Sequence, residues 1–300
     1  MIYLSVCSIL GHNPEKVEYL DLQLNGDTEK YVDPNMIEYL ADRSKGDLQV
    51  LSKQANTQIY SFFNQIIKIL KSDENEQKKR IEMNNLFSFF QEPQHLNLGI
   101  SLEGNTGKGT TAKELVKIFM REDVVSLILD ESGLTIPQKT PLFPYFADDK
   151  LSDLTSNIIM NVIIEFNKKI VVLYPEMSSY LSSVNEEYNY YSNGTWKQMR
   201  HKPFIFSEKK VLFIPKDFAT YKQTSSLSLL MRTILVEAIE KDKIKNNREK
   251  RKTKKEFEKE NIAGNRTENT RKIYDESTEV SYKYYQKEVI NKVKERLTKD

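Results

Sequence analysis

Apolar residues in the first quarter of the chain follow two different periods. Residues 2–10 form an apolar run that predicts a buried strand, and residues 17–24 alternate apolar and polar positions, which predicts a half-buried strand. Asp33 and Pro34 then predict a helix start, because Asp accepts amide hydrogen bonds and Pro fits the first helical position. Apolar residues at helical spacing over 47–71 predict a long helix.

The middle of the chain continues the alternation of elements. Residues 96–102 have a strand-like pattern, and residues 124–129 fit either a short strand or a buried helix. Residues 132–147 contain one Gly and three Pro, which predicts a long loop. The strongest helical pattern in the chain follows over 150–167, with Asp148 or Asp149 expected as its cap.

The second half begins with polar and aromatic sequence and ends with helical patterns. Residues 186–201 are rich in Tyr and Asn and are interpreted as a loop. Residues 202–218 hold two apolar segments around 207–210 and predict a hairpin. Helical patterns run from residue 225 onward, and a last helix is expected at about 270–297.

Together these elements predict an α/β (mixed α+β) domain over residues 1–222, followed by a helical, basic C-terminal extension over 223–300. The chain has 300 residues, 39% of them hydrophobic, which is enough for a packed core and excludes wholesale disorder.

Composition narrows the class of protein further. Cys7 is the single cysteine, so no internal disulfide forms, and a cytoplasmic location is expected. The three histidines lie far apart and show no zinc-ligand spacing. No apolar run approaches the roughly 20 residues of a membrane helix, so no membrane partner is expected. The net charge of +2 predicts no partner, so only local charge is informative.

A glycine-rich loop between a predicted strand and a predicted helix is the first candidate for chemistry. Its glycines and helix-start amides suit a phosphate, which Lys108 would help to neutralise. Only two residues separate Gly104 from Gly107, whereas a Walker A loop needs four. Three interpretations stay open: a nucleotide-hydrolysing loop, a site for another phosphate such as a nucleic-acid backbone, and a loop that only caps the helix. The candidate phosphate-binding residues are Gly104, Gly107, Lys108, Gly109 and Thr110.

A polar stripe of one carboxylate and two amides on the predicted helix 150–167 is the second candidate. Asp153, Asn157 and Asn161 are spaced at i, i+4 and i+8, so they share one stripe that could hold a metal or orient a substrate. The alternative is an ordinary polar flank of the helix.

A metal-dependent nuclease would draw on Asp153 and on carboxylates outside this stripe, which are Glu103, Asp130, Asp148 and Asp149, with Lys108 or Lys216 as the basic partner. Such a site needs two or three carboxylates around Mg²⁺, together with a basic partner. We predict Asp149, Asp153 and Lys216 as catalytic residues, and Asp130 and Asp153 as Mg²⁺ ligands.

The basic segment 241–255 is the strongest compositional feature, with nine basic and two acidic residues. Clustered Lys and Arg neutralise phosphates, which favours nucleic-acid binding, whereas a solvated helix face or a disordered arm is the alternative. The candidate nucleic-acid contacts are Lys245, Arg248, Lys250, Arg251 and Lys252.

Three short motifs, DDKLSDLTSNII (148–159), VLFIPKDF (211–218) and YVDPNMIEYL (31–40), resemble a group of poorly characterised bacterial proteins found with mobile elements and phage-defence gene clusters. The resemblance covers roughly residues 15–220 and implies a context of defence and nucleic acid. It singles out Asp149, Lys150, Asp153, Asn157, Pro215, Lys216, Gly107, Lys108 and Gly109.

The sequence therefore favours a bacterial defence protein that acts on or beside nucleic acid, as a Mg²⁺-dependent nuclease or as its nucleic-acid-binding subunit. One alternative is a nucleotide-binding enzyme of kinase type that uses the glycine loop. Another is a non-catalytic adaptor whose C-terminal helices dock a partner protein subunit.

Overall fold

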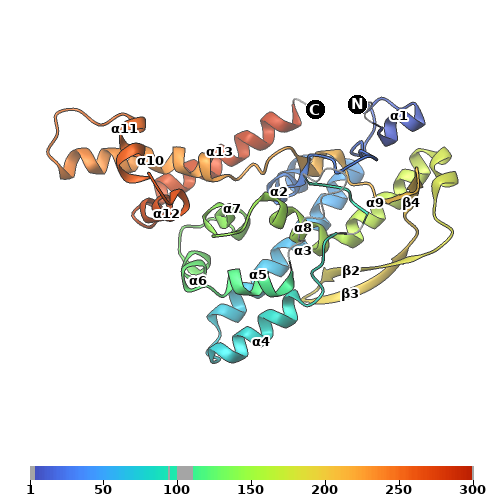
Figure 1. Ribbon diagram of the computed structural model, residues 1–300, viewed down its shortest axis with the longest axis horizontal. Helices are drawn as coiled ribbons and strands as arrows, with labels where there is room; N and C mark the ends of the chain where they lie inside the picture. Colours follow the sequence, from blue (N-terminus) through green and yellow to red (C-terminus); the bar gives the residue numbers. More distant parts are fainter. Residues whose placement is uncertain (1–3, 94, 100–110, 299–300) are drawn as a thin grey trace.

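The computed structural model describes residues 4–93, 95–99 and 111–298. This part of the chain combines many helices with three small two-stranded antiparallel sheets, and a helical region ends it (Figure 1). The α-helices before the sheets are α1 (Val6–Leu10), α2 (Pro34–Arg43), α3 (Gly46–Lys71), α4 (Glu76–Phe87), α5 (Ala112–Phe119), α6 (Glu122–Leu129), α7 (Ile136–Lys139), α8 (Asp148–Ile158) and α9 (Met160–Leu173). Short 3₁₀ helices are η1 (Thr140–Leu142), η2 (Pro175–Tyr180) and η3 (Lys216–Phe218).

The N-terminal apolar run is a short helix, so the prediction of a strand over 2–10 is wrong for its described residues. Ser5 and Ser8 exchange side-chain to backbone hydrogen bonds and start α1, and Gly11, at φ +68°, ends it. The segment 17–24 forms no regular strand, so the prediction of a strand there is wrong, although its leucines are buried in alternation as predicted. It pairs only through isolated bridges, such as the one between Tyr19 and Pro215.

Helices α2 and α3 form where the sequence places them. The Asp33 side chain accepts a hydrogen bond from the Asn35 amide, and Pro34 occupies the first turn of α2. One face of α3 enters the core, where Phe62 is fully buried and Phe63 is nearly so. Burying each of these rings contributes about 1.5–3 kcal/mol, which fixes α3 as the central helix of the core.

Residues 111–147 are more helical than expected. The run 124–129 belongs to helix α6, and the predicted loop 132–147 contains α7 and η1. The Thr135 side chain and Gln138 form a capping box at the start of α7, and Pro137 lies in its first turn. These local signals outweigh the loop-like content of Gly and Pro.

The predicted helix 150–167 is two helices, because α8 ends at Ile158 and α9 begins at Met160. Ile159 lies at the junction with φ −98° and ψ 16°. Asp148 and Asp149 occupy the first turn of α8, while its N-cap is Ala147, which makes no side-chain capping bond. The capping prediction is therefore wrong. Acidic residues in the first turn still stabilise the helix, because their negative charge interacts favourably with the positive end of the helix dipole.

Residues 186–201 form the longest hairpin of the described chain, so the prediction of a loop there is wrong. Strands β2 (Glu186–Ser192) and β3 (Thr195–His201) pair over their full length. Asn193 and Gly194 both have positive φ, as a tight two-residue turn requires. Tyr191 of this hairpin packs edge-on against Phe62 of α3, with the ring centroids 5.0 Å apart.

The second hairpin confirms the prediction for 202–218. Strands β4 (Phe204–Phe206) and β5 (Lys209–Val211) flank Ser207 and Glu208, which both have positive φ. The third sheet pairs β1 (Tyr31–Val32) with β6 (Ala219–Thr220), which brings the start of α2 beside the segment that leads into the C-terminal helices.

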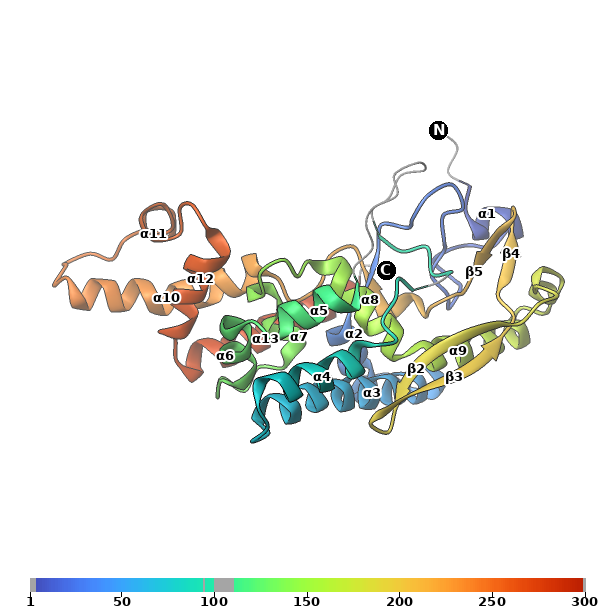
Figure 2. The same ribbon diagram turned by 60° about the horizontal axis from the view of Figure 1, so that its bottom comes forward.

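The C-terminal region is helical, as predicted, and its last two helices replace the expected single helix at 270–297. The four helices are α10 (Leu227–Lys245), α11 (Lys254–Asn261), α12 (Arg266–Asp275) and α13 (Glu279–Leu297). Helices α10 and α11 project from one end of the molecule, and α13 runs back to α2 (Figures 1 and 2). The Tyr285 hydroxyl donates to the Gln138 carbonyl oxygen at 3.2 Å, so this region docks on α7.

One carboxylate joins α10 to the start of α13. Glu237 accepts hydrogen bonds from Ser281, from both donors of Thr278, and from Lys241. Burial opposes the charge, but these donors outweigh it and lower the pKa of Glu237 to about 2. Its stabilising effect is therefore present above the unfolded pKa of about 4.5 and is lost as the pH falls towards 2.

Glu237→Gln is expected to lower the free energy of unfolding by about 1–2 kcal/mol at pH 7, because the charged acceptor is lost. Chemical denaturation at pH 7 and at pH 3 measures the difference, which should shrink at the lower pH. Glu240→Gln on the same helix is the control, since Glu240 is more exposed. An unchanged stability of Glu237→Gln at pH 7 would contradict this role.

Candidate functional site

The strongest candidate site is a group of carboxylates around Asp153 on helix α8. Asp149 precedes Asp153 by one helical turn, so both lie on one face of α8. Glu92 and Asp27 come from two separate loops and act electrostatically on Asp153. We call these four residues the acidic cluster.

Hydrogen bonds on both loops hold the acidic cluster together. The Asn157 side-chain amide donates to the carbonyl oxygens of Gln91 and Asp153, at 2.7 and 2.8 Å, and thereby fixes the chain beside Glu92. Thr28, the residue after Asp27, forms a parallel bridge with Leu98. The described end of the predicted strand 96–102 therefore reaches this site.

Asp153 has an unusual environment for a carboxylate. Within the described ranges, its side chain has no hydrogen-bond or ion-pair partner. Burial raises the pKa of Asp153 to about 7, and the negative charges of Asp149, Glu92 and Asp27 act in the same direction. Charged groups placed in this way are costly to a fold and are frequent at functional sites.

The arrangement can do two things chemically. Near neutral pH the Asp153 carboxyl exists in both protonation states, which suits a general acid or base. In its charged form it attracts a cation, because the neighbouring charges are all negative. Nearby, burial also raises the pKa of Asp148, to which the Gln223 amide donates a hydrogen bond.

The predicted basic partner Lys216 is positioned elsewhere. Its Nζ donates to the Glu15 carbonyl oxygen at 2.7 Å, and its charge acts on the buried thiol of Cys7. Lys216 is not among the charges that shift the pKa of Asp153. The structure therefore brings Asp149 and Asp153 together and places Lys216 at the N-terminal segment.

The predicted Mg²⁺ ligand Asp130 is occupied by protein donors. It accepts hydrogen bonds from Lys139 at 2.6 Å, from Ser132 and from the Tyr274 hydroxyl at 2.7 Å. Burial opposes its charge, but these donors outweigh it and hold the pKa of Asp130 below its usual value. Asp130 thus links α6, α7 and α12, which is a structural role.

Three-ligand metal sites built from His, Cys, Asp or Glu are absent from the part of the chain that the structure describes. A cation at the acidic cluster would therefore depend on two carboxylates, with water or substrate oxygens completing its coordination.

The glycine loop prediction falls outside the described residues, which resume at 111. Glu103, Gly104, Gly107, Lys108, Gly109 and Thr110 are thus not placed. Thr111, the next residue, caps helix α5 in a capping box with Glu114.

The polar stripe on α8 is not a ligand set. Asn161 lies beyond the junction at Ile159, and its side-chain oxygen accepts a hydrogen bond from Gln58 at 2.9 Å. Asn157 serves to hold the loop at Gln91. Only Asp153 of the three is left without a partner in the described structure, so the predicted stripe consists of two amides that hold the fold and one carboxylate without a partner.

The basic segment is partly neutralised by nearby acids. Arg251 pairs with Glu240 at 2.7 Å, Arg248 lies 3.8 Å from Asp242, and Lys252 lies close to Asp242 and Glu260. Lys245 and Lys250 form no ion pair within the described ranges. Ion pairing reduces the positive field that this segment presents to a polyanion.

Sequence reasoning missed Glu92 and Asp27, whose loops reach Asp153 only through tertiary contacts. It also missed the β2–β3 hairpin, for which Asn193-Gly194 was an available turn signal.

Within the residues that the structure describes, no helix is both long and apolar enough to cross a membrane.

Comparison with known proteins gives one match. A family model described as a domain of unknown function, DUF8370, matches residues 10–226, which include the acidic cluster and end at the N-cap of α10. No curated protein and no solved structure matches the chain.

Proposed function

We propose that this chain, which belongs to the DUF8370 family of domains of unknown function, acts on nucleic acid. In this proposal a divalent cation binds at Asp149 and Asp153. The observation that supports this most is the Asp153 carboxylate, which is largely buried among other carboxylates and lacks a protein partner. A bound cation would compensate its charge and those of its neighbours.

The residues present fit a Mg²⁺ ion of the kind that acts on phosphates. Mg²⁺ prefers oxygen ligands and is often held by one or two carboxylates, with water and substrate phosphates completing its coordination. When bound, it would neutralise charge on a phosphodiester and orient it. Asp149 is exposed at the start of α8, so a large substrate can reach it, whereas Asp153 lies deeper.

The basic segment 241–255 supplies a second contact in this proposal. Lys245 and Lys250 are available to phosphates. Arg248, Arg251 and Lys252 would each have to leave an ion pair with an acidic residue before they bind a phosphate. We therefore expect this segment to add modest, sequence-independent affinity that weakens with salt.

The biological setting in the proposal is bacterial defence or mobile-element biology in the cytoplasm. It is supported by the resemblance of residues 31–40, 148–159 and 211–218 to proteins of that context.

Fluorescence anisotropy with labelled duplex DNA and RNA tests the proposal, at 50 and 200 mM salt and with Mg²⁺ or EDTA. Micromolar binding that weakens steeply with salt is expected, and Mg²⁺ should strengthen it about tenfold. Asp149→Asn should lose the Mg²⁺ effect. Asp73→Asn is the matched control, because Asp73 is an exposed residue outside the acidic cluster.

Absence of nucleic-acid binding at the lower salt concentration would overturn the proposal. Saturable binding of ATP or GTP would then favour the nucleotide enzyme, and capture of a defined partner subunit would favour the adaptor. Binding that is identical in Mg²⁺ and EDTA would refute the cation site while leaving the nucleic-acid contact.

A further inference from the structure

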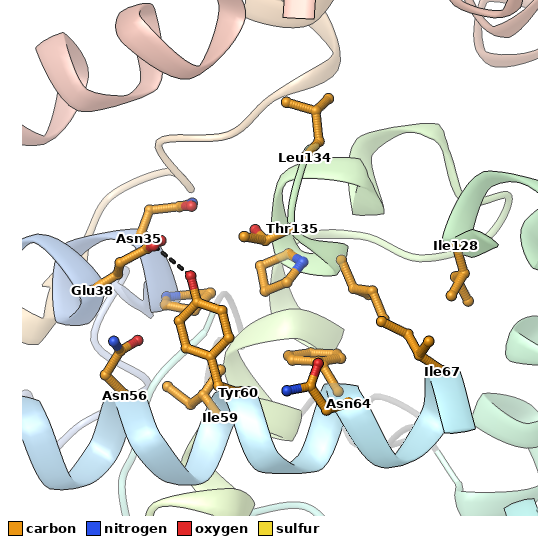
Figure 3. A pocket seen from close by; sticks show the side chains of 14 residues that line it. Asn35, Glu38, Asn56, Ile59, Tyr60, Asn64, Ile67, Ile128, Leu134 and Thr135 are labelled. Atoms are coloured by element: carbon orange, nitrogen blue, oxygen red, sulfur yellow. Dashed lines mark hydrogen bonds between the residues drawn. The ribbon is translucent and has the colours of Figure 1, made fainter. Parts of the chain in front are cut away.

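A hollow with no residue of the acidic cluster in its wall lies between α2, α3 and the segment that joins α6 to α7 (Figure 3). Its volume is about 90 Å³. Most of its wall is apolar and comes from three separate stretches of chain. The apolar residues are Pro34, Ile59, Phe63, Ile67, Ile128, Leu134, Ile136 and Pro137. We call this hollow the α2–α3 pocket.

Asn35, Glu38 and Tyr60 give the α2–α3 pocket a polar end, and Asn56 and Asn64 of α3 also line it. The Tyr60 hydroxyl donates a hydrogen bond to the Glu38 carboxylate at 2.6 Å (Figure 3). The side chain of Asn35 extends from α2 on the same side, and Thr135 lies across from it (Figure 3). An apolar wall with a few convergent polar groups is the usual form of a small-molecule site.

Asn35 lies at this end, but its amide is turned to the protein and not to the pocket. Its Nδ2 donates to Asp33 at 3.1 Å and to the Ser225 hydroxyl at 3.3 Å, and its Oδ1 is fully buried. The Glu38 carboxylate is the charged group of the pocket wall. It accepts a hydrogen bond from Tyr60 and has no ion-pair partner among the described residues, so its negative charge is left for a cation.

The polar end continues into a larger groove of about 450 Å³ beneath α13. Asn35, Glu38, Tyr60 and Thr135 line both hollows. The groove adds Val289 and its neighbours from α13, and its charged groups further out are Asp42, Arg43 and Lys294. A molecule longer than the α2–α3 pocket therefore has room to extend past its polar end.

We propose that the α2–α3 pocket binds a small organic amine whose apolar group fills the pocket and whose nitrogen pairs with the Glu38 carboxylate. A carboxylate at the end of an apolar wall favours a protonated amine over a carboxylic acid or a neutral alcohol. The binding site belongs to elements other than the acidic cluster, so this inference stands independently of the proposed function.

Benzylamine, benzyl alcohol and benzoate are probes of similar size that differ in the polar group. Titration of each into the full-length protein, followed through isoleucine and leucine methyl NMR signals, tests the site. Saturable shifts are expected at Ile59, Ile67, Ile128, Leu134 and Ile136, with benzylamine binding at least fivefold tighter than the other two probes.

Glu38→Gln is the informative variant, because its side-chain oxygen can still accept from Tyr60 while the charge is removed. It should abolish the preference for benzylamine. Glu122→Gln, an exposed residue at the start of α6, should keep it. Equal binding of the three probes, shifts at other methyl groups, or no saturable binding would each overturn the proposal.

Discussion

Asp153→Asn is expected to remove a large part of the pH dependence of stability between about pH 4 and pH 7. Burial and three neighbouring carboxylates raise the pKa of Asp153 to about 7 from an ordinary value of 3.8. The folded protein therefore binds a proton more tightly than the unfolded chain over this range. Stability falls as the pH rises through it, by at most about 4 kcal/mol for a shift of this size.

Chemical denaturation of the wild type and Asp153→Asn at pH 5 and pH 8 measures this effect. In EDTA, the wild type should lose about 2–4 kcal/mol more than the variant between the two pH values. Asp149→Asn is the comparison, and because it removes only one neighbouring charge it should give a much smaller change. A wild type and an Asp153→Asn variant with the same pH dependence would contradict the raised pKa.

Magnesium gives the same experiment a second readout. If Asp149 and Asp153 bind Mg²⁺, the ion should restore stability of the wild type at pH 8, since it binds the folded state preferentially. Asp153→Asn should show no such gain. Restoration in both proteins would show that Mg²⁺ acts at another place.

Asp130→Ala is expected to lower the free energy of unfolding by about 2–4 kcal/mol, because it leaves the Lys139 ammonium buried without its partner. Lys139 is only 3% exposed in its side chain and also donates to the Leu127 carbonyl oxygen. The variant further removes the acceptor of the Tyr274 hydroxyl, which joins α12 to this pair.

Thermal and chemical unfolding of Asp130→Ala, of Lys139→Met and of the double variant measure this effect. The double variant should recover part of the loss, because no uncompensated charge stays buried. Asp123→Ala, at a more exposed ion pair with Arg271, is the control and should cost less. If Asp130 were instead a Mg²⁺ ligand, Asp130→Ala would abolish the Mg²⁺ effect on nucleic-acid binding with little change in stability.

Local chemistry in the sequence determined several elements without help from the rest of the fold. Asp33 and Pro34 start α2 because a side-chain acceptor and a fixed φ act within one turn. The helical period of apolar residues gave α3, since one face of a long helix must be buried. Asn193-Gly194 was an equally local signal, although the polar, aromatic sequence around it favoured a loop.

The secondary structure of short apolar runs could not be predicted from the spacing of their apolar residues alone. The run at 6–10 and the run at 124–129 are each too short to separate a strand from a buried helix, and both are helices. The end of α8 at Ile158 likewise follows no Gly or Pro. Asn157 and Asn161 on either side of this end are held by Gln91 and Gln58, which are distant in sequence.

The candidate sites divide in the same way. Sequence alone selected Asp149 and Asp153 as candidate catalytic residues, and they share a face because α8 begins early enough to include both. Only the tertiary structure placed Glu92 and Asp27 beside Asp153, Lys139 beside Asp130, and Tyr60 beside Glu38. Burial and the charges of distant residues set the pKa and the partner of a side chain, and these depend on the packed fold.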